Sequence, residues 1–386
     1  MKKICLIAWE RFSYGGISRV LSDIVTGLSE NHEITILCLK NAAALENVYG
    51  IDFSKVRIVH KELTFAQKLR REFVDRYLYK ILRKFTWGIK YYQSIKYSRS
   101  YRNWLISVIG NNYDIVIGAS GLNESYLLSS IAPRIGGTKI GWMHTSFEGY
   151  FLQGSTTDVD YALKMGKANL SKLDKLVVLS KSDEKKFSLF CETSFIYNPV
   201  PFSTDSRANL SSQTFVFVGA LSGVKGADIL IDAFVLFAKK EKQWKLSIHG
   251  DGPMWKYIKE TVKKNGLEER VSLKHSTKNV KSIYLGGSAL LFPSRLEGFG
   301  IVQGEAMICG LPVLAHRLPI TEELIASQEC GLLYDNNSAE ELCSLMERYA
   351  ELNIDRKTEL QQNAVRFAGS LTKDTILERW NQCILQ

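Results

Sequence analysis

The sequence is short of the features that mark several classes of protein. No apolar run reaches the roughly 18 residues that a membrane-spanning helix needs. The start, MKKICLIAWERF, has the basic residues of a signal peptide, but its apolar run is short and no small-residue cleavage site follows it. We therefore interpret it as a buried first strand and expect a cytoplasmic protein. No repeat with a solenoid period is visible.

Paired cysteines are also absent. The seven cysteines are scattered and form no C-x-x-C pair. Cys5, Cys38 and Cys309 lie within apolar runs, where a reduced thiol acts as a small hydrophobic side chain. The sequence indicates neither a disulfide framework nor a zinc site, and we expect no bound metal.

The 386 residues suffice for two domains, and short apolar runs alternate with amphipathic stretches, as in βαβ units. The strands expected in the first half are KKICLIA, EITILCL, VRIVH, YDIVIGAS, TKIGWMH and KLVVLS. Those expected in the second half are TFVFVGA, KLSIHG, RVSLK, ALLFPS and LPVLAH. The fold class expected is α/β, with two Rossmann-like doubly wound domains facing each other across a cleft.

The expected domains are residues 1–200 and 201–370. The polar segment PVPFSTDSRANLSSQ between the halves is typical of an interdomain linker. The last amphipathic segment, residues 372–385, suits either domain, and residues 371–386 could pack back on the first one.

The formal net charge of +10 is concentrated between residues 67 and 104, where basic and aromatic residues alternate. One interpretation is a pair of solvated helices whose aromatic side chains belong to the core. Contact with an anionic membrane surface stays open beside it, because rings enter the headgroup layer while cations attract lipid phosphates. Nucleic acid is the weakest interpretation, and we expect no such partner.

In doubly wound sheets ligands bind at the carboxyl ends of the strands. The most informative such segment is RLEGFGIVQGEAMICGLPVLAH, in which a glycine-containing loop joins a strand to a helix beginning near Ile301. Glu297 and Glu305 offer acceptors to sugar hydroxyls, and the helix amides offer donors to an anion. Acidic residues favoured by the helix dipole would explain Glu305, but they explain Glu297 less well.

This segment resembles the Glu-x7-Glu signature of retaining glycosyltransferases of family 4, which have the GT-B fold. The resemblance implies that Glu297 contacts the donor sugar and Glu305 the ribose. It also implies that the amides around Phe299, Gly300 and Ile301 line the sugar and the diphosphate.

A second loop, VFVGALSGVKGADIL, places Lys225 at a helix start, where its charge adds to an anion site. The family resemblance implies an Arg five positions earlier, where this chain has Ala220. Gly15 and Gly16 precede a helix without the G-x-G-x-x-G pattern, which argues against a dinucleotide site. The resemblance implies that this pair lies against the donor phosphate. Arg19, one turn later, is a candidate replacement for the missing Arg.

Four further candidates follow expected strands. His144 lies after TKIGWM, and we expect it to position the donor sugar or acceptor rather than to act as a base. Asn198 resembles a family position near the cleft. Ser276 and Thr277 lie where the resemblance implies the nucleobase, beside a structural turn formed by Asp251-Gly252-Pro253. Asp158 and Asp160 form a D-x-D, which we interpret as helix capping rather than a metal motif.

The resemblance implies retaining transfer of a hexose from a nucleotide sugar, with UDP favoured over GDP, and the nucleotide sugar is a substrate rather than a cofactor. The catalytic residues expected are Glu297, Lys225 and His144. We expect a saccharide acceptor, lipid-linked, in capsule or lipopolysaccharide assembly, with the enzyme peripheral on the inner face of the membrane. A catalytically silent binding relative and a nucleotide-sugar epimerase stay open as alternatives.

Overall fold

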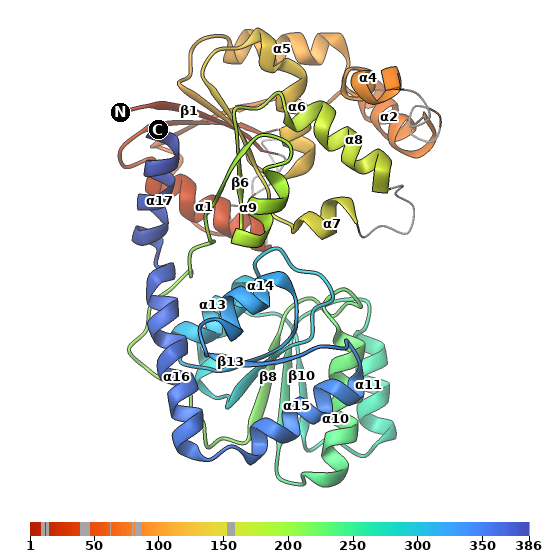
Figure 1. The fold of residues 1–386 in the computed structure, drawn as a ribbon, viewed down its shortest axis with the longest axis vertical. Coiled ribbons are helices and arrows are strands. Elements are labelled where there is room, and N and C mark those ends of the chain that lie inside the picture. The colour runs from red at the N-terminus through yellow and green to blue at the C-terminus, as the bar shows by residue number, and fades with distance from the viewer. Residues whose placement is uncertain are drawn as a thin grey trace. The chain divides into compact units, whose positions relative to one another are not determined.

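The computed structural model describes residues 1–8, 12, 15–38, 47–61, 63–78, 81, 86–152 and 159–385. The chain divides into two compact units, each of which is a parallel sheet with helices packed on it (Figure 1). The first unit is Met1–Asn198 with Lys373–Gln386, and the second is Pro199–Thr372. The division lies close to the boundary at 200 and 201 that the sequence suggests.

The described part of the first unit contains a sheet in the order β3-β2-β1-β4-β5-β6-β7. Its apolar runs are buried, as in Ile4–Ala8 of β1, because a parallel sheet is covered on both faces. The strands are β1 (Lys3–Ala8), β2 (Glu33–Cys38), β3 (Val56–His60), β4 (Ile115–Gly118), β5 (Thr138–Trp142), β6 (Lys175–Val178) and β7 (Glu192–Phe195). The helices are α1 (Gly16–Leu28), α2 (Phe65–Phe73), the π-helical turn η2 (Val74–Leu78), α4 (Thr86–Lys96), α5 (Arg99–Ile109), α6 (Leu122–Ile131), η3 (Ala132–Arg134), α7 (Phe147–Phe151), α8 (Val159–Leu170), α9 (Lys181–Phe187) and α17 (Lys373–Leu385).

The second unit has the sheet order β10-β9-β8-β11-β12-β13. Its strands are β8 (Thr214–Val218), β9 (Lys245–His249), β10 (Val271–Lys274), β11 (Ala289–Phe292), β12 (Val313–His316) and β13 (Gly331–Tyr334). Its helices are α10 (Ala227–Lys240), α11 (Trp255–Lys264), α12 (Val280–Leu285), α13 (Ile301–Ile308), α14 (Pro319–Thr321), η4 (Glu322–Ala326), α15 (Ala339–Glu351), α16 (Ile354–Ala368) and η5 (Gly369–Leu371).

Both sheets reverse their strand order at one point, between β1 and β4 in the first unit and between β8 and β11 in the second. Loops diverge on either side of such a point and leave a crevice for a ligand at the carboxyl ends of the strands. All eleven strands expected from the sequence are present. The structure adds β7 and β13, whose sequences ETSF and GLLY are short and only partly buried.

The interpretation of residues 199–213 as a linker is wrong for the second part of that segment, which packs on the second unit. Ala208 and Leu210 are buried, and the Ala208 amide donates to the Cys309 carbonyl at 2.8 Å. The Ser288 hydroxyl donates to the Leu210 carbonyl at 2.7 Å. A polar composition indicates a linker, but a few apolar side chains with paired backbone groups are enough to dock this irregular segment.

The C-terminal helix α17 belongs to the first unit and lies beside α1 (Figure 1). A Cβ on Gly27 would lie 2.1 Å from Leu377 Cδ1, so the glycine allows the close approach of the two helices. Trp380 packs edge-on against Trp142, with ring centroids 4.6 Å apart.

The basic and aromatic segment 67–104 is divided between core and surface. Tyr92, Tyr97 and Tyr101 are buried, as the core interpretation predicts, whereas Phe73 and Tyr77 are exposed. Tyr79, Lys80, Arg83, Lys84 and Phe85 lie outside the described residues. In the described ranges, no helix combines the length and apolarity needed to cross a bilayer.

Candidate functional site

The loop between β11 and α13 holds Glu297, whose side chain is 11% exposed. Gly300 ends this loop with φ 75°, and a Cβ there would lie 2.8 Å from Phe292 Cζ, so only glycine fits this backbone without strain. Phe299 is buried, and its carbonyl accepts from Gln303 Nε2 at 2.9 Å. The loop therefore leads directly into the first amides of α13, beginning at Ile301.

Lys225 lies in the loop between β8 and α10, and its Nζ is 2.6 Å from Glu297 Oε2. The two loops meet because Gly226, at φ 69°, lies against Pro293, where an added Cβ would be 2.1 Å from the carbonyl oxygen. Strands β8 and β11 are the neighbours at which the sheet order reverses. The structure thus brings together two of the predicted residues, 72 positions apart, at the place where such sheets bind ligands.

Arg295 holds this pair of loops together, a role that the sequence alone does not reveal. Its guanidinium makes a bidentate contact with Asp228, at 2.8 and 2.7 Å, and also donates to the Gly223 carbonyl. The hydrogen bonds from Arg295 lower the pKa of the Asp228 carboxyl. Arg295 opens the motif-bearing segment, but no spacing rule links it to Asp228, which is 67 positions away.

Glu305 lies on the second turn of α13 and accepts a hydrogen bond from the Tyr284 hydroxyl at 2.8 Å. Tyr284 is fully buried, and burial raises its pKa far above the ordinary value, so it stays a donor. Like Arg295, Tyr284 is a supporting residue that sequence reasoning missed, because it is one of many apolar-flanked tyrosines.

The predicted nucleobase loop contains an internal network. The Ser276 amide and hydroxyl both donate to Asp251 Oδ2, at 3.0 and 2.6 Å, so Ser276 is already engaged by the turn that follows β9. These bonds, followed by that of His275, lower the Asp251 pKa to about 2. Thr277 accepts from the Asn279 amide at 3.2 Å. The His275 ring stacks on Trp255 with centroids 4.2 Å apart.

His144 is the central residue of the first unit's candidate site. It is buried after β5, and its Nε2 lies 2.8 Å from the Ala119 carbonyl that follows β4. Burial lowers its pKa to about 4, so the ring is neutral at pH 7. Because Nε2 faces a carbonyl it carries the proton, and Nδ1 is left as an acceptor. The His144 amide donates to the Tyr150 hydroxyl at 3.2 Å.

The other predicted residues of the first unit lie at the start of α1 and after β7. Gly15, at φ 151°, has open space where a Cβ would be, and Gly16 begins α1. Asn198 is buried. Arg19 lies 3.2 Å from Asp23 and over the Tyr49 ring, which already engages it within the first unit. Its proposed substitution for an Arg at Ala220 therefore receives no support from these contacts.

The D-x-D segment is only partly described, because Asp158 lies outside the described residues. Asp160 is on α8 and pairs with Lys164 at 2.6 Å, one turn further along the helix. Within the described ranges no three His, Cys, Asp or Glu side chains are grouped as metal ligands would be.

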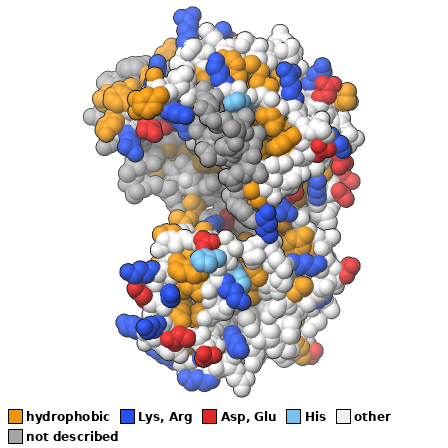
Figure 2. Space-filling model, turned by 180° about the vertical axis from the view of Figure 1, so that it is seen from behind, with side chains coloured by type: hydrophobic (Ala, Val, Ile, Leu, Met, Phe, Trp, Pro, Cys, Tyr) orange, Lys and Arg blue, Asp and Glu red, His pale blue; other side chains and the backbone are white. Residues whose placement is uncertain are grey.

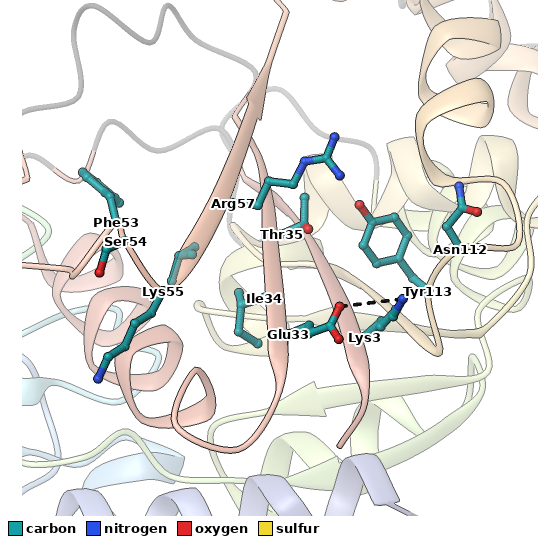
Figure 3. Close-up of a pocket in the computed structure, with 11 residues that line it drawn as sticks. Lys3, Glu33, Ile34, Thr35, Phe53, Ser54, Lys55, Arg57, Asn112 and Tyr113 are labelled. Atoms are coloured by element: carbon teal, nitrogen blue, oxygen red, sulfur yellow. Dashed lines mark ion pairs between the residues drawn. The ribbon is translucent and has the colours of Figure 1, made fainter.

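A cavity of about 570 Å³ opens at the opposite edge of the first sheet, away from these residues (Figure 3). It is lined by the amino ends of β1, β2 and β3, including Lys3, Glu33 and Arg57, and by Tyr113 before β4. Lys3 and Glu33, which are neighbours in the register of β1 and β2, form an ion pair at 3.7 Å. None of the predicted site residues lines this cavity.

The structure thus has two Rossmann-like parallel sheets, and the second sheet has a charged pair at its switch point. The crystal structure of Anabaena HepE in complex with UDP and glucose has this fold, with a TM-score of 0.72 at 16% identity over 100% of both chains. That likeness and the two observed sheets confirm the predicted α/β class with two Rossmann-like domains.

Residues 202–367, which lie within the second unit, match the family model described as glycosyl transferases group 1. An uncharacterized glycosyltransferase of Methanocaldococcus jannaschii is 30% identical over 61% of this chain and 60% of its own length. The lipopolysaccharide core biosynthesis mannosyltransferase LpsB of Rhizobium meliloti is 30% identical over 36% of this chain and 42% of its own length. The chain thus spans about half the length of the curated relatives it matches.

Proposed function

We propose that the protein is a retaining glycosyltransferase that moves a hexose from a nucleotide sugar, UDP-linked rather than GDP-linked, to a saccharide acceptor. The observation that carries the proposal is the Lys225–Glu297 pair at the switch point of the second sheet. The family match of residues 202–367 supports sugar transfer, and the UDP bound by HepE supports the choice of nucleotide.

The ion pair suggests how the donor binds. Lys225 and Glu297 neutralise each other at 2.6 Å, and a nucleotide sugar offers each of them a replacement partner. Its diphosphate takes the place of Glu297 beside Lys225, and its sugar hydroxyls take the place of Lys225 beside Glu297. The first amides of α13 add donors for the diphosphate, since the helix start is its positive end. Glu305, oriented by Tyr284, accepts from the ribose hydroxyls.

The proposed reaction breaks the bond between the anomeric carbon and the diphosphate oxygen. The acceptor oxygen then bonds to the same face of that carbon, and its proton passes to the leaving phosphate. Lys225 and the helix amides stabilise the charge that grows on the diphosphate, in positions fixed before the reaction, and no metal is required. His144 accepts a hydroxyl hydrogen of the acceptor at Nδ1 and positions the acceptor, since a pKa of about 4 makes the ring a weak base.

For the acceptor we propose a lipid-linked saccharide of cell-surface polysaccharide assembly, taken at the inner face of the membrane. The partial likeness to a lipopolysaccharide core enzyme and the basic, aromatic segment 67–104 support this choice.

The first test is thermal unfolding with UDP, GDP and ADP, without added metal, for the wild type and for Glu305→Ala. A ligand that binds only the folded state adds about 2.7 kcal/mol at a hundredfold excess over its dissociation constant. We expect stabilisation by UDP that Glu305→Ala loses. No stabilisation by any nucleotide would instead support a silent binding relative. Release of an epimerised nucleotide sugar without acceptor would contradict transfer.

A further inference from the structure

Helix α2 turns its apolar side chains toward solvent. None of its residues is buried, although its sequence FAQKLRREF holds three large apolar side chains. Phe65, Leu69 and Phe73 are 77%, 50% and 53% exposed. A helix in a globular protein normally buries such a face against its own core. This one presents it outward.

Tyr77 and Ile81, 61% and 58% exposed, continue the same four-residue spacing. In an α-helix a step of four residues overshoots one turn by about 40°, so such a row would wind around the helix. In the π-helical turn η2 the hydrogen bonds span five residues, and a step of four falls short of a turn. The two deviations have opposite signs and keep Tyr77 in line with the three apolar residues of α2. The Phe73 and Tyr77 rings are 5.6 Å apart. We call Phe65, Leu69, Phe73, Tyr77 and Ile81 the α2 stripe.

The opposite side of α2 is fixed to the rest of the first unit. Thr64 and Gln67 form a capping box at the helix start, and Arg70 Nε donates to the Ile95 carbonyl at 2.7 Å. The buried Lys96 pairs with Asp75 at 3.1 Å, and the Tyr92 hydroxyl donates to the same carboxylate at 2.5 Å. The helix is therefore held in place with the stripe outward.

The surroundings of the α2 stripe are positively charged. Lys68 and Arg70 lie roughly 100° to either side of its centre on a helical projection. Asp75, one of the two nearby acidic residues, is already neutralised by Lys96. The pKa of Arg102 is lowered by burial and then by the nearby positive charges of Arg134, Arg70 and Arg99. These four arginines are therefore close enough to repel one another. Apolar side chains gather with Lys and Arg at this edge in Figure 2.

We propose that the α2 stripe docks on an anionic lipid bilayer. Its apolar side chains enter the headgroup and acyl boundary, and Lys68 and Arg76 meet the lipid phosphates. Charge complementarity favours this occupant over a second copy of the chain, because two stripes would bring like charges together. The surface needs no nucleotide sugar, so its test is independent of the proposed transferase activity.

Flotation with vesicles of phosphatidylcholine, with and without about one quarter phosphatidylglycerol, tests the proposal. We expect the wild type to float with the anionic vesicles and to be released by high salt. Phe65→Ser/Leu69→Ser/Phe73→Ser should weaken binding about tenfold or more, because it removes the inserting side chains. Lys68→Gln/Arg76→Gln should weaken it by on the order of tenfold at low salt.

The matched control is Leu189→Ser/Ile354→Ser, which removes apolar side chains that are 46% and 53% exposed elsewhere and should float like the wild type. All changed positions are exposed, and an unchanged thermal midpoint shows that each variant is folded. Wild type that ignores anionic vesicles, or a triple variant that floats as well as wild type, overturns the proposal. A wild-type dimer that the triple variant dissociates, without vesicle binding, would assign the stripe to self-association instead.

Discussion

The two units share a strand order but differ in the chemistry at the carboxyl ends of their strands. In the second unit the switch point holds formal charges, with Lys225 paired to Glu297 and Arg295 to Asp228. In the first unit the predicted residue His144 follows β5, and its buried, neutral ring is hydrogen-bonded to the backbone carbonyl of Ala119 after β4.

This difference shows that the fold alone does not decide what each unit binds. A charged pair that can open suits a ligand with its own charge, such as a diphosphate. A neutral acceptor nitrogen suits an uncharged hydroxyl. The family model covers residues 202–367, so the sequence features shared with that family lie in the second unit, which holds the charged pair. The proposed function therefore assigns donor binding to the second unit and acceptor binding to the first.

The largest effect should follow from breaking the charged pair. Lys225→Met removes the cation proposed for the diphosphate, and Glu297→Gln removes the acceptor proposed for the sugar while keeping its shape. Each should lower kcat/KM for sugar transfer from UDP-glucose or a related donor by about 10²–10³-fold, the loss typical of one preorganised electrostatic contact.

The exposed pair Lys256–Glu260 on α11 provides the matched control, with atoms 3.7 Å apart and both side chains largely in solvent. Lys256→Met and Glu260→Gln should each leave kcat/KM within about twofold of wild type, as for a surface pair. Equal losses in both pairs would show that any charge removal harms the enzyme, and the proposed role of Lys225 would fall.

The neutral state of the His144 ring should be visible in the pH dependence of the free energy of unfolding. Burial lowers the His144 pKa from 6.5 to about 4, so the unfolded chain binds the proton first as the pH falls. The contribution of the neutral His144 ring to the free energy of unfolding is complete above pH 6.5 and is lost as the pH falls from there toward 4. Between about pH 7 and pH 5, wild type should lose about 2 kcal/mol more than His144→Gln, which keeps an amide donor for Ala119.

Urea unfolding at the two pH values measures this difference, and the dependence common to both proteins cancels. Equal losses in wild type and His144→Gln would mean that the ring takes up a proton as readily in the folded chain as in the unfolded one. The proposed contrast between a charged and a neutral unit would then disappear.

The sheets were predictable because their strands are continuous apolar runs that end in glycine or polar residues. Residues 199–213 were not, since a polar composition does not show which backbone groups find partners. Of the candidate site, Lys225 and Glu297 could be found from motifs that follow strand ends. Arg295 and Tyr284 could not, because their roles depend on contacts with Asp228 and Glu305 that only the folded chain creates.

An intermediate effect should follow from loosening the loop that carries Lys225. Arg295→Ala removes the bidentate contact with Asp228, so the backbone around Gly223 is no longer fixed. We expect the KM for the donor to rise about tenfold with a smaller change in kcat, since a misplaced side chain weakens binding before it changes the chemistry.

Arg317 is a suitable control for this variant. Its guanidinium pairs with two carboxylates, Glu322 and Asp335, where that of Arg295 pairs with one, and 43% of its side chain is exposed compared with 39% for Arg295, but it holds no site loop. Arg317→Ala should leave the donor KM near that of wild type. If both variants raised it equally, the effect would reflect lost charge rather than a loosened loop.

The smallest effect should separate nucleotide binding from sugar transfer within the second unit. Tyr284→Phe removes the hydroxyl that orients Glu305 and leaves the ring in its buried place. We expect about 1 kcal/mol less unfolding free energy, the usual cost of a lost buried hydrogen bond, and a nucleotide affinity lower by about threefold. Tyr257→Phe, whose hydroxyl bonds to Asp232 on the exposed surface, should change neither quantity. Because the proposal assigns the leaving diphosphate to Lys225 and the sugar to Glu297, kcat at saturating donor should stay near wild type. A fall in kcat without a fall in nucleotide affinity would place Glu305 at the reacting sugar and contradict its assignment to the ribose.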